Sequence, residues 1–378
     1  MTSQERHEAR YRRRVAKRAE KKVKKLATCN DFEKVFSYEN LYKSYRKSRC
    51  NVAWKASMQK YICQAPANIQ ITLEKLLEGT FKSYGFVEFD ICERGKLRHI
   101  KSVCIEERIV QRCLCDYSLV PALSRTFIHD NGASLKNKGY TFSVRRITQH
   151  LREHYRKYGT DGYILTFDFS KFFDSISHEL IKKIVRRELT NTKLLNLIDH
   201  FIDAFGGSAG IGLGSQVSQI FALAAANRLD HFVKEILGVK HYGRYMDDGY
   251  LIHPSKEYLA SCLSSIRLIC EELDLKLNEK KTQIVKLSHG FSFLKVHFRI
   301  TESGKIIKTM PHGSITKMRH KLKSFYVLYK NGKMTLQDVY ASYQSWRAYS
   351  ENFNAYRTRR NMDDLYNNLF IFTKGEYV

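Results

Sequence analysis

The stretch GRYMDDGYLI, residues 243–252, limits the folds open to this chain more than any other, because it sets two adjacent carboxylates, Asp247 and Asp248, between apolar flanks. Each anion raises the free energy of ionising the other, and burial adds a desolvation cost. The residues on both sides alternate as strands do, which predicts a hairpin with Met-Asp-Asp at its tip. Asp is an ordinary turn residue, but a turn does not require a second acid. The pair therefore indicates a compensating cation.

A third acid stands in the stretch LTFDFSKFFDSI, residues 165–176. Asp168 lies near the carboxyl end of a predicted buried strand, 162–169, where an unpaired acid would be costly. We expect Asp168 and the Asp247/Asp248 pair on adjacent strands of one sheet, where they bind two Mg²⁺ ions, with Mn²⁺ as a substitute. Two such ions activate an attacking hydroxyl and stabilise a leaving pyrophosphate. The three acids therefore predict nucleotidyl transfer.

The composition indicates a nucleic-acid partner. Lys and Arg total 65 against 38 acidic residues, a formal charge of +27, and 23 Tyr and 22 Phe offer faces for stacking. The alternative is a soluble protein that is basic for another reason. No run approaches the ~20 apolar residues of a membrane helix, and the N-terminus lacks the apolar core of a signal peptide. The nine cysteines show no zinc-site spacing. We expect a cytoplasmic protein without membrane contact.

Periodicity predicts the other elements. Residues 1–27 hold 11 Lys or Arg and 3 Glu, so they form a charged helix without a core face, either a frayed terminus or an RNA-binding arm. Residues 81–91 and 96–103 alternate around a turn and predict a basic two-stranded ribbon. Three basic, aromatic helices follow residue 313. One long helix after the Gly-rich stretch 206–216 is predicted from a stripe formed by Val217, Phe221, Ala225, Leu229, Phe232 and Ile236.

The motifs from about residue 90 to 300 resemble, in order, those of bacterial reverse transcriptases of the group II intron-like branch. YMDD and FDFSKFFDS are joined by LGSQVSQIFALAAANRLDHF (213–232), LNEKKTQIV (277–285) and FSFLKVHF (291–298). Leu213-Gly214 and Ser218-Gln219 depart from the intron pattern and are similar to diversity-generating retroelement and defence-associated enzymes. The resemblance implies an α+β, right-hand polymerase fold: a basic N-terminal helical extension (1–30), fingers (31–160), a palm with an antiparallel sheet (161–300) and a helical thumb (301–378).

The resemblance also implies roles for the catalytic residues. Asp168 and Asp247 are the principal metal ligands, joined by the Phe169 carbonyl and supported by Asp248. Lys281 protonates the departing pyrophosphate, although a solvated lysine fits that position nearly as well and Lys280 competes for the role.

Substrate contacts follow from the same resemblance. Phe173 is the steric gate that blocks a 2′-hydroxyl, with a plain core phenylalanine as the alternative, as we expect for Phe172. Gly212, Gly214 and Ser215 would let backbone approach the template and the nucleotide. Nucleotide contacts fall to Lys96, Arg98, Lys136, Lys138, Gly214, Gln216 and Gln219, and the primer grip to Phe293, Leu294 and Lys295. Lys295 replaces the usual Gly.

The function implied is that of an RNA-directed DNA polymerase which uses dNTPs to make DNA from a cognate structured non-coding RNA. Phage defence is the favoured role, because the chain carries no nuclease or mobility machinery. Untemplated or RNA synthesis, diversification by a retroelement, and a non-catalytic, maturase-like RNA-binding role remain alternatives. The type of primer and assembly into a homo-oligomer stay open.

Overall fold

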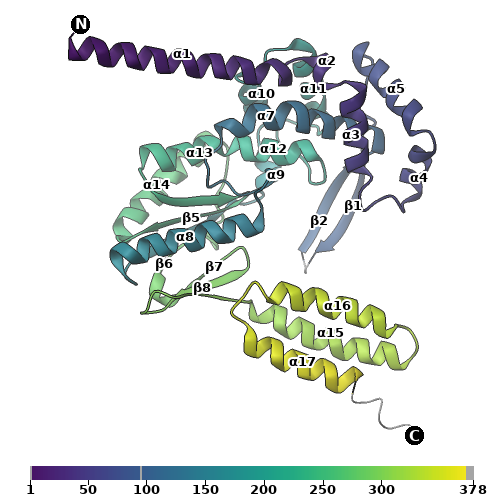
Figure 1. Cartoon of the computed structure of the whole chain (residues 1–378), viewed down its shortest axis with the longest axis vertical. Helices are drawn as coiled ribbons and strands as arrows, with labels where there is room; N and C mark the ends of the chain where they lie inside the picture. The colour runs from purple at the N-terminus through teal and green to yellow at the C-terminus, as the bar shows by residue number, and fades with distance from the viewer. Residues whose placement is uncertain (1, 94–95, 372–378) are drawn as a thin grey trace.

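The computed structural model describes residues 2–93 and 96–371, with the side chains of residues 18, 19, 22, 25, 93 and 96 outside the described part. The fold is α+β, with the fingers, palm and helical thumb of a right-hand polymerase (Figure 1). Helix α1 (Ser3–Cys29) projects from one end of the molecule, and in its last turn Leu26 and Cys29 meet the main core. The three thumb helices lie at the opposite end (Figure 1).

The fingers are helical apart from one ribbon. Strands β1 (Phe86–Glu93) and β2 (Lys96–Val103) pair antiparallel over their whole length. β1 begins five residues later than predicted, because the amides of Ser83 and Tyr84 bond to side chains, His200 and Glu107, and not to a strand. The helices are α2 (Phe32–Val35), α3 (Tyr38–Ser48), α4 (Ala56–Cys63), α5 (Ala65–Leu77), α6 (Ile105–Leu114) and α7 (Val120–Leu123), the last two joined by a π-helical turn at Cys115–Leu119.

The palm is built on a four-stranded antiparallel sheet of order β4-β5-β3-β6, comprising β3 (Tyr163–Asp168), β4 (His241–Tyr245), β5 (Asp248–His253) and β6 (Gln283–Lys286). Leu165 and Leu251 face the core that contains α14 (Lys256–Glu272), whereas Ile164 and Ile252 face α8 (Tyr140–Tyr158). Both faces of the sheet are therefore covered, which explains the nearly continuous apolar runs of β3 and β5. Burial on both faces fixes the register of the strands that end at the predicted site.

A second antiparallel sheet, β7 (Phe291–Phe293), β8 (Val296–Ile300) and β9 (Ile306–Thr309), leads from the palm to the thumb. The thumb helices are α15 (His312–Lys330), α16 (Leu336–Ser350) and α17 (Tyr356–Phe370), and they share a separate core. That core is rich in aromatic contacts, such as the stacked rings of Tyr343 and Tyr366 at 4.6 Å. The three helices predicted after residue 313 are confirmed.

The prediction of one uninterrupted helix from Val217 to Ile236 is wrong. The segment comprises α12 (Gln216–Ala225), α13 (Asn227–His231) and a π-helical turn, Phe232–Ile236. The break at Ala226 lies beside Asn227, whose side chain donates to the Thr126 hydroxyl. Because a π turn adds a residue per turn, the apolar stripe rotates away from the core and leaves Ile236 73% exposed.

Candidate active site

The three predicted acids lie together at one edge of the palm sheet. Asp168 ends β3 and Asp248 begins β5, and the two are directly opposite in the antiparallel register. Asp247 occupies the turn of the β4–β5 hairpin, and its carbonyl accepts a hydrogen bond from the Phe169 amide at 3.2 Å. One carboxylate oxygen from each acid lies within 4.8 Å of the others. The predicted adjacency of these acids is therefore present.

The electrostatics of the triad disfavour three charged carboxylates. Burial, and then the charge of Asp168, raise the pKa of Asp247. Burial, and then the charges of Asp247 and Asp168, raise the pKa of Asp248 to about 7. The Lys281 ammonium forms an ion pair with Asp168, and this hydrogen bond raises the pKa of the lysine. Asp168 is 4% exposed and the Lys281 side chain 51% exposed, so the lysine reaches in from solvent.

This donor set fits hard divalent cations. It offers carboxylate oxygens only, the ligands that Mg²⁺ prefers, and their mutual repulsion is the strain that a bound cation relieves. In the part of the chain that the structure describes, no other group of His, Cys, Asp and Glu side chains is arranged to hold a metal ion. Asp168, Asp247 and Asp248 would therefore hold the metals. Phe169 directly follows Asp168 in the chain, and the aromatic ring of Phe169 stacks on that of Phe172 in the core.

A fully buried ion pair anchors the hairpin tip, and sequence reasoning missed it. The Arg244 guanidinium donates to both carboxylate oxygens of Asp230, each at 2.7 Å, and both side chains have 0% exposure. A third donor of the same guanidinium reaches the Met246 carbonyl at 2.7 Å. Met246 has φ +53°, an unfavourable conformation for a side chain other than Gly. The ion pair therefore holds the turn that presents Asp247.

Two further contacts complete this anchor. The Tyr242 hydroxyl donates to Asp230 at 2.6 Å, and Arg244 also donates to the Leu223 carbonyl of α12. The arginine thus links α12, α13 and the catalytic hairpin. One signal in the sequence was available: Arg244 stands in a predicted strand with apolar neighbours, where a buried charge would require a partner.

The Gly-rich loop packs against the fingers ribbon. The Lys101 amide donates to the Leu213 carbonyl at 2.8 Å, so the loop extends the edge of β2. Gly214 has φ +116°, and a Cβ there would lie 2.9 Å from the Lys101 carbonyl oxygen. The close neighbour of Gly214 is therefore the backbone of β2. A close approach of Gly214 to a nucleotide remains a prediction.

Some of the polar residues around the Gly-rich loop form hydrogen bonds to the fingers. Ser215 is buried and donates to Gln111 at 2.7 Å. Gln219 is exposed on α12 and accepts from the Ser134 hydroxyl at 3.0 Å, while Gln216 is half-buried at the start of the same helix. The loop thus connects α12 to the fingers, and Gln216 and Gln219 keep part of their surface open to a substrate.

Phe172 and Phe173 differ in burial. Phe172 is 4% exposed and stacks on Phe169, with ring centroids 4.9 Å apart. Phe173 is only half-buried, at the edge of the main core, and its carbonyl accepts from the Ile211 amide at 3.0 Å. The backbone bond ties Phe173 to the Gly-rich loop and leaves part of its ring exposed. The role of Phe173 as a steric gate remains a prediction.

The predicted finger cations have different surroundings. Arg98 is exposed on β2, whereas the side chain of Lys96 lies outside the described residues. Lys136 is exposed in the loop before α8. The Lys138 ammonium donates to the carbonyls of His129 and Asn131, each at 2.8 Å, and burial lowers its pKa. Lys138 therefore closes its own loop in this structure, which leaves Arg98 and Lys136 as the more accessible candidates.

The predicted primer grip forms the β7–β8 turn. Phe293 is buried and meets Tyr250 of β5 edge to face, at 5.0 Å between centroids. Leu294 and Lys295 have φ +49° and +62°. Positive φ at both central residues is the geometry of a type I′ turn, which Gly and Asn favour. The charge of Lys295 also acts on Asp248, lowering its pKa against the larger effects of burial and the neighbouring acids.

Replacing Lys295 with Gly should raise the free energy of unfolding by about 0.5–1 kcal/mol. Relief of the left-handed conformation gains about 1–2 kcal/mol, and the greater entropy of unfolded Gly offsets about half of it. Urea unfolding followed by circular dichroism measures the change. Lys295→Ala is the matched control, because it removes the ammonium and keeps the strain; an equal gain in both variants would assign the effect to charge.

No helix among residues 2–93 and 96–371 combines the length and the apolar character needed to cross a membrane.

Comparison with known proteins identifies one family. The profile described as reverse transcriptase (RNA-dependent DNA polymerase) matches residues 90–298, more than half of the chain. Protein YkfC of Escherichia coli (strain K12) is 23% identical over 268 residues, which cover 60% of this chain and 70% of YkfC.

Similar solved structures include telomerases. Telomerase from Candida albicans in complex with a TWJ fragment of telomeric RNA shows 14% identity and a TM-score of 0.45, covering 75% of this chain and 55% of that one. Apo telomerase from Candida tropicalis shows 15% identity and a TM-score of 0.46, covering 65% and 53%. This chain thus spans about half the length of those telomerases. Because the profile match contains all three acids, the hairpin and the Gly-rich loop, the chain belongs to the reverse transcriptase family, the RNA-dependent DNA polymerases.

Proposed function

We propose that this chain copies an RNA template into DNA by two-metal nucleotidyl transfer, with Mg²⁺ as the physiological ion and Mn²⁺ as a substitute. The observation that carries the proposal is the meeting of Asp168, Asp247 and Asp248 at the tip of the palm hairpin, within 4.8 Å of one another. Within a reverse transcriptase fold, this arrangement matches the chemistry of metal-assisted attack by a primer hydroxyl on a nucleotide. The family match supports the same reaction.

Asp168 and Asp247 hold the metal ions, and Asp248 supports the charge of the site. When bound, the two ions lower the pKa of the attacking hydroxyl and stabilise the charge that develops on the leaving group. Lys281 is the candidate proton donor: its ammonium contacts Asp168 and has a raised pKa, so it carries a proton at neutral pH. A positioned acid of this kind assists departure of pyrophosphate.

Residues around the triad select and hold the substrates. Phe173 excludes a 2′-hydroxyl with its half-buried aromatic side chain. Arg98 and Lys136 contact the triphosphate, and Gln216 and Gln219 contact the template–primer duplex. Lys96 and Lys138 are further candidates for the triphosphate, as Gly214 is for close approach of the nucleotide. Phe293, Leu294 and Lys295 form the primer grip, since their turn lies beside the palm strand that begins with Asp248.

The finer assignment is that of a cytoplasmic enzyme of the group II intron-like branch, which uses a cognate structured non-coding RNA in antiviral defence. Leu213-Gly214 and Ser218-Gln219 depart from the intron pattern itself and support a place beside the diversity-generating retroelement and defence-associated enzymes. Diversification by a retroelement uses the same chemistry and differs in the RNA copied. Sequencing the RNA that copurifies with the protein, together with its DNA product, distinguishes the two roles and identifies the template.

A primer-extension assay tests the proposed reaction. Purified protein with a DNA-primed RNA template, dNTPs and Mg²⁺ should yield full-length DNA, and EDTA should abolish it. Product of equal length and amount without a template would instead indicate untemplated synthesis. No product with RNA or DNA primers, in Mg²⁺ or Mn²⁺, would contradict the polymerase assignment.

The same assay tests the gate. Phe173→Ala should improve ribonucleotide use relative to deoxynucleotide use by on the order of tenfold or more, because the pocket no longer rejects the hydroxyl. Extension with dNTPs by this variant controls for its folding. If the preference for deoxynucleotides over ribonucleotides were unchanged while extension with dNTPs stayed intact, Phe173 would be a packing residue and not a gate.

A further inference from the structure

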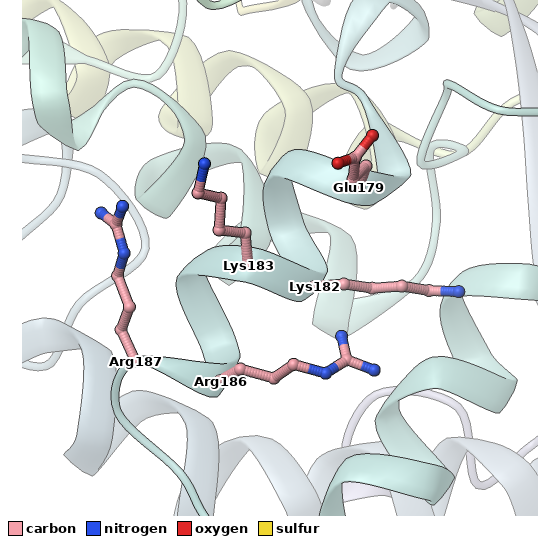
Figure 2. Close-up of a pocket in the computed structure, with 5 residues that line it drawn as sticks. All are labelled: Glu179, Lys182, Lys183, Arg186 and Arg187. Atoms are coloured by element: carbon pink, nitrogen blue, oxygen red, sulfur yellow. The ribbon is translucent and has the colours of Figure 1, made fainter.

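Helix α10 (His178–Arg186) carries a basic face that the polymerase site does not use. His178, Ile181 and Val185 are buried on one side of the helix. On the other side Glu179, Lys182, Lys183, Arg186 and Arg187 line an open depression, and Figure 2 shows these five side chains extending from successive turns. The spacing i, i+3, i+4, i+7, i+8 places four cations and one acid on a single helical face.

Neighbouring acids neutralise only part of this face. Lys182 bonds to Asp203 and Arg186 to Asp199, both at 2.5 Å and both from α11 (Thr192–Asp203). Lys183 and Arg187 are exposed and, among the residues that the structure describes, have no acidic side chain within ion-pair distance. Two cations one helical turn apart thus remain for an external anion, ~6 Å apart along the helix axis.

Helix α1 continues the basic surface. The Asn30 side chain, which follows α1, accepts from the Thr190 and Asn191 amides and donates to the Thr190 hydroxyl, all at 2.8–3.0 Å. These bonds fasten the base of α1 to the α10–α11 connection. The whole helix is ~40 Å long, and it projects from the body at its N-terminal end (Figure 1). Its three acids cannot balance 11 Lys or Arg, and Tyr11 and Val23 are 63% and 67% exposed.

We propose that α10 and α1 form a second RNA-binding surface, which holds a duplex segment of the RNA whose single-stranded part is copied at the triad. The proposal rests on the proposed function and adds a site to it. The charges are arranged along two helices without an aromatic platform at α10, which suits a phosphate backbone better than splayed bases. An extended duplex also matches the length of α1, whereas a nucleotide does not. The thumb lies at the other end of the molecule, so this surface is separate from the one expected to hold the template–primer duplex (Figure 1).

Charge reversal at the two cations without an acidic partner, Lys183→Glu with Arg187→Glu, tests the proposal. The probes are an unstructured RNA template and the same template followed by an RNA hairpin, each annealed to one DNA primer. Fluorescence anisotropy should show about tenfold weaker binding of the hairpin RNA, with the slope of log affinity against log salt reduced by about 2. Extension of the unstructured template should stay within about twofold. Arg10→Glu with Arg14→Glu should weaken hairpin binding in the same way.

Two controls separate this surface from net charge. Lys60→Glu with Lys256→Glu removes the same charge from exposed positions elsewhere and should leave hairpin binding unchanged. Lys183→Arg with Arg187→Lys keeps both charges and should bind normally. Equal loss on both templates, or no loss on the hairpin, would each overturn the proposal. Binding is measured without catalysis, so failure of the polymerase assay would not be mistaken for failure of this site.

Discussion

Asp247→Asn is expected to abolish DNA synthesis while making the metal-free protein more stable. Loss of a carboxylate proposed to hold the metal ions removes several kcal/mol of transition-state stabilisation, so the extension rate should fall by on the order of 10³-fold or more. The amide has nearly the same shape as the carboxylate, and the hairpin anchor at Arg244 does not involve it. The loss would therefore arise from chemistry and not from unfolding.

The gain in stability follows from the raised pKa of Asp247. A carboxyl whose pKa is higher in the folded protein than in the unfolded chain binds more protons when folded, so its ionisation destabilises the fold as pH rises through the folded pKa. Removing the charge of residue 247 removes its electrostatic repulsion of Asp168 and Asp248. At pH 8 in EDTA, Tm should rise by ~2 °C, and the gain should shrink at pH 5, because Asp248, whose pKa is about 7, is then protonated and repels Asp247 less.

Asp364→Asn is the matched control, because Asp364 stands in a second Met-Asp-Asp sequence, 362–364, on the exposed side of thumb helix α17. It should change neither activity nor the pH dependence of Tm. Scanning calorimetry and primer extension measure both variants. Retained extension by Asp247→Asn would contradict the catalytic role, and a lower Tm at pH 8 would contradict the repulsion within the triad.

Much of this site could be predicted because its determinants are local. Strands β3 and β5 are alternating or apolar runs that end in acids, and the tripeptide Met-Asp-Asp marks the turn between β4 and β5. Placing Asp168 opposite Asp248 also required knowing that β3 and β5 pair. The expectation that these buried acids share metal ions placed them on adjacent strands, and the register bears it out.

Contacts between residues far apart in the sequence could not be predicted from the sequence patterns. Nothing local links Asp230 in α13 to Arg244 in β4, since the two residues lie on different elements and meet only in the folded chain. The contact of Gly214 with β2 depends on how the fingers and palm meet, and glycine alone signals only that backbone comes close. The π turn at Phe232–Ile236 shifts the stripe by one residue, which a 3.6-residue period cannot represent.

The buried pair of Asp230 and Arg244 leads to the second large prediction. Asp230→Ala should lower the free energy of unfolding by about 3–5 kcal/mol, because it leaves a guanidinium with 0% exposure without its counter-ion. Chemical denaturation measures the loss. A matched pair is available in Arg125 and Glu188, whose side chains are 19% and 15% exposed. Glu188→Ala should cost less, because water reaches that pair.

Stability and positioning can be separated by replacing the whole anchor with apolar residues. The triple variant Tyr242→Phe, Asp230→Leu, Arg244→Met leaves no buried charge, and such replacements are often neutral for stability or favourable. It also removes the donor to the Met246 carbonyl, so the turn that carries Asp247 loses its support. We expect the free energy of unfolding to lie within about 1.5 kcal/mol of the wild-type value. The extension rate should fall by roughly 10–100-fold, as it does when an outer-shell contact at a metal site is lost.

The dependence on metal concentration identifies the cause of that reduction. If the anchor orients Asp247, the variant should need several times more Mg²⁺ for half-maximal extension, and Arg244→Lys, which cannot make the forked bond, should fall between it and wild type. Wild-type activity and metal dependence in a stable triple variant would show that the turn holds its conformation without Arg244. The pair would then contribute only to folding, because its contact with the hairpin would have no effect on the chemistry.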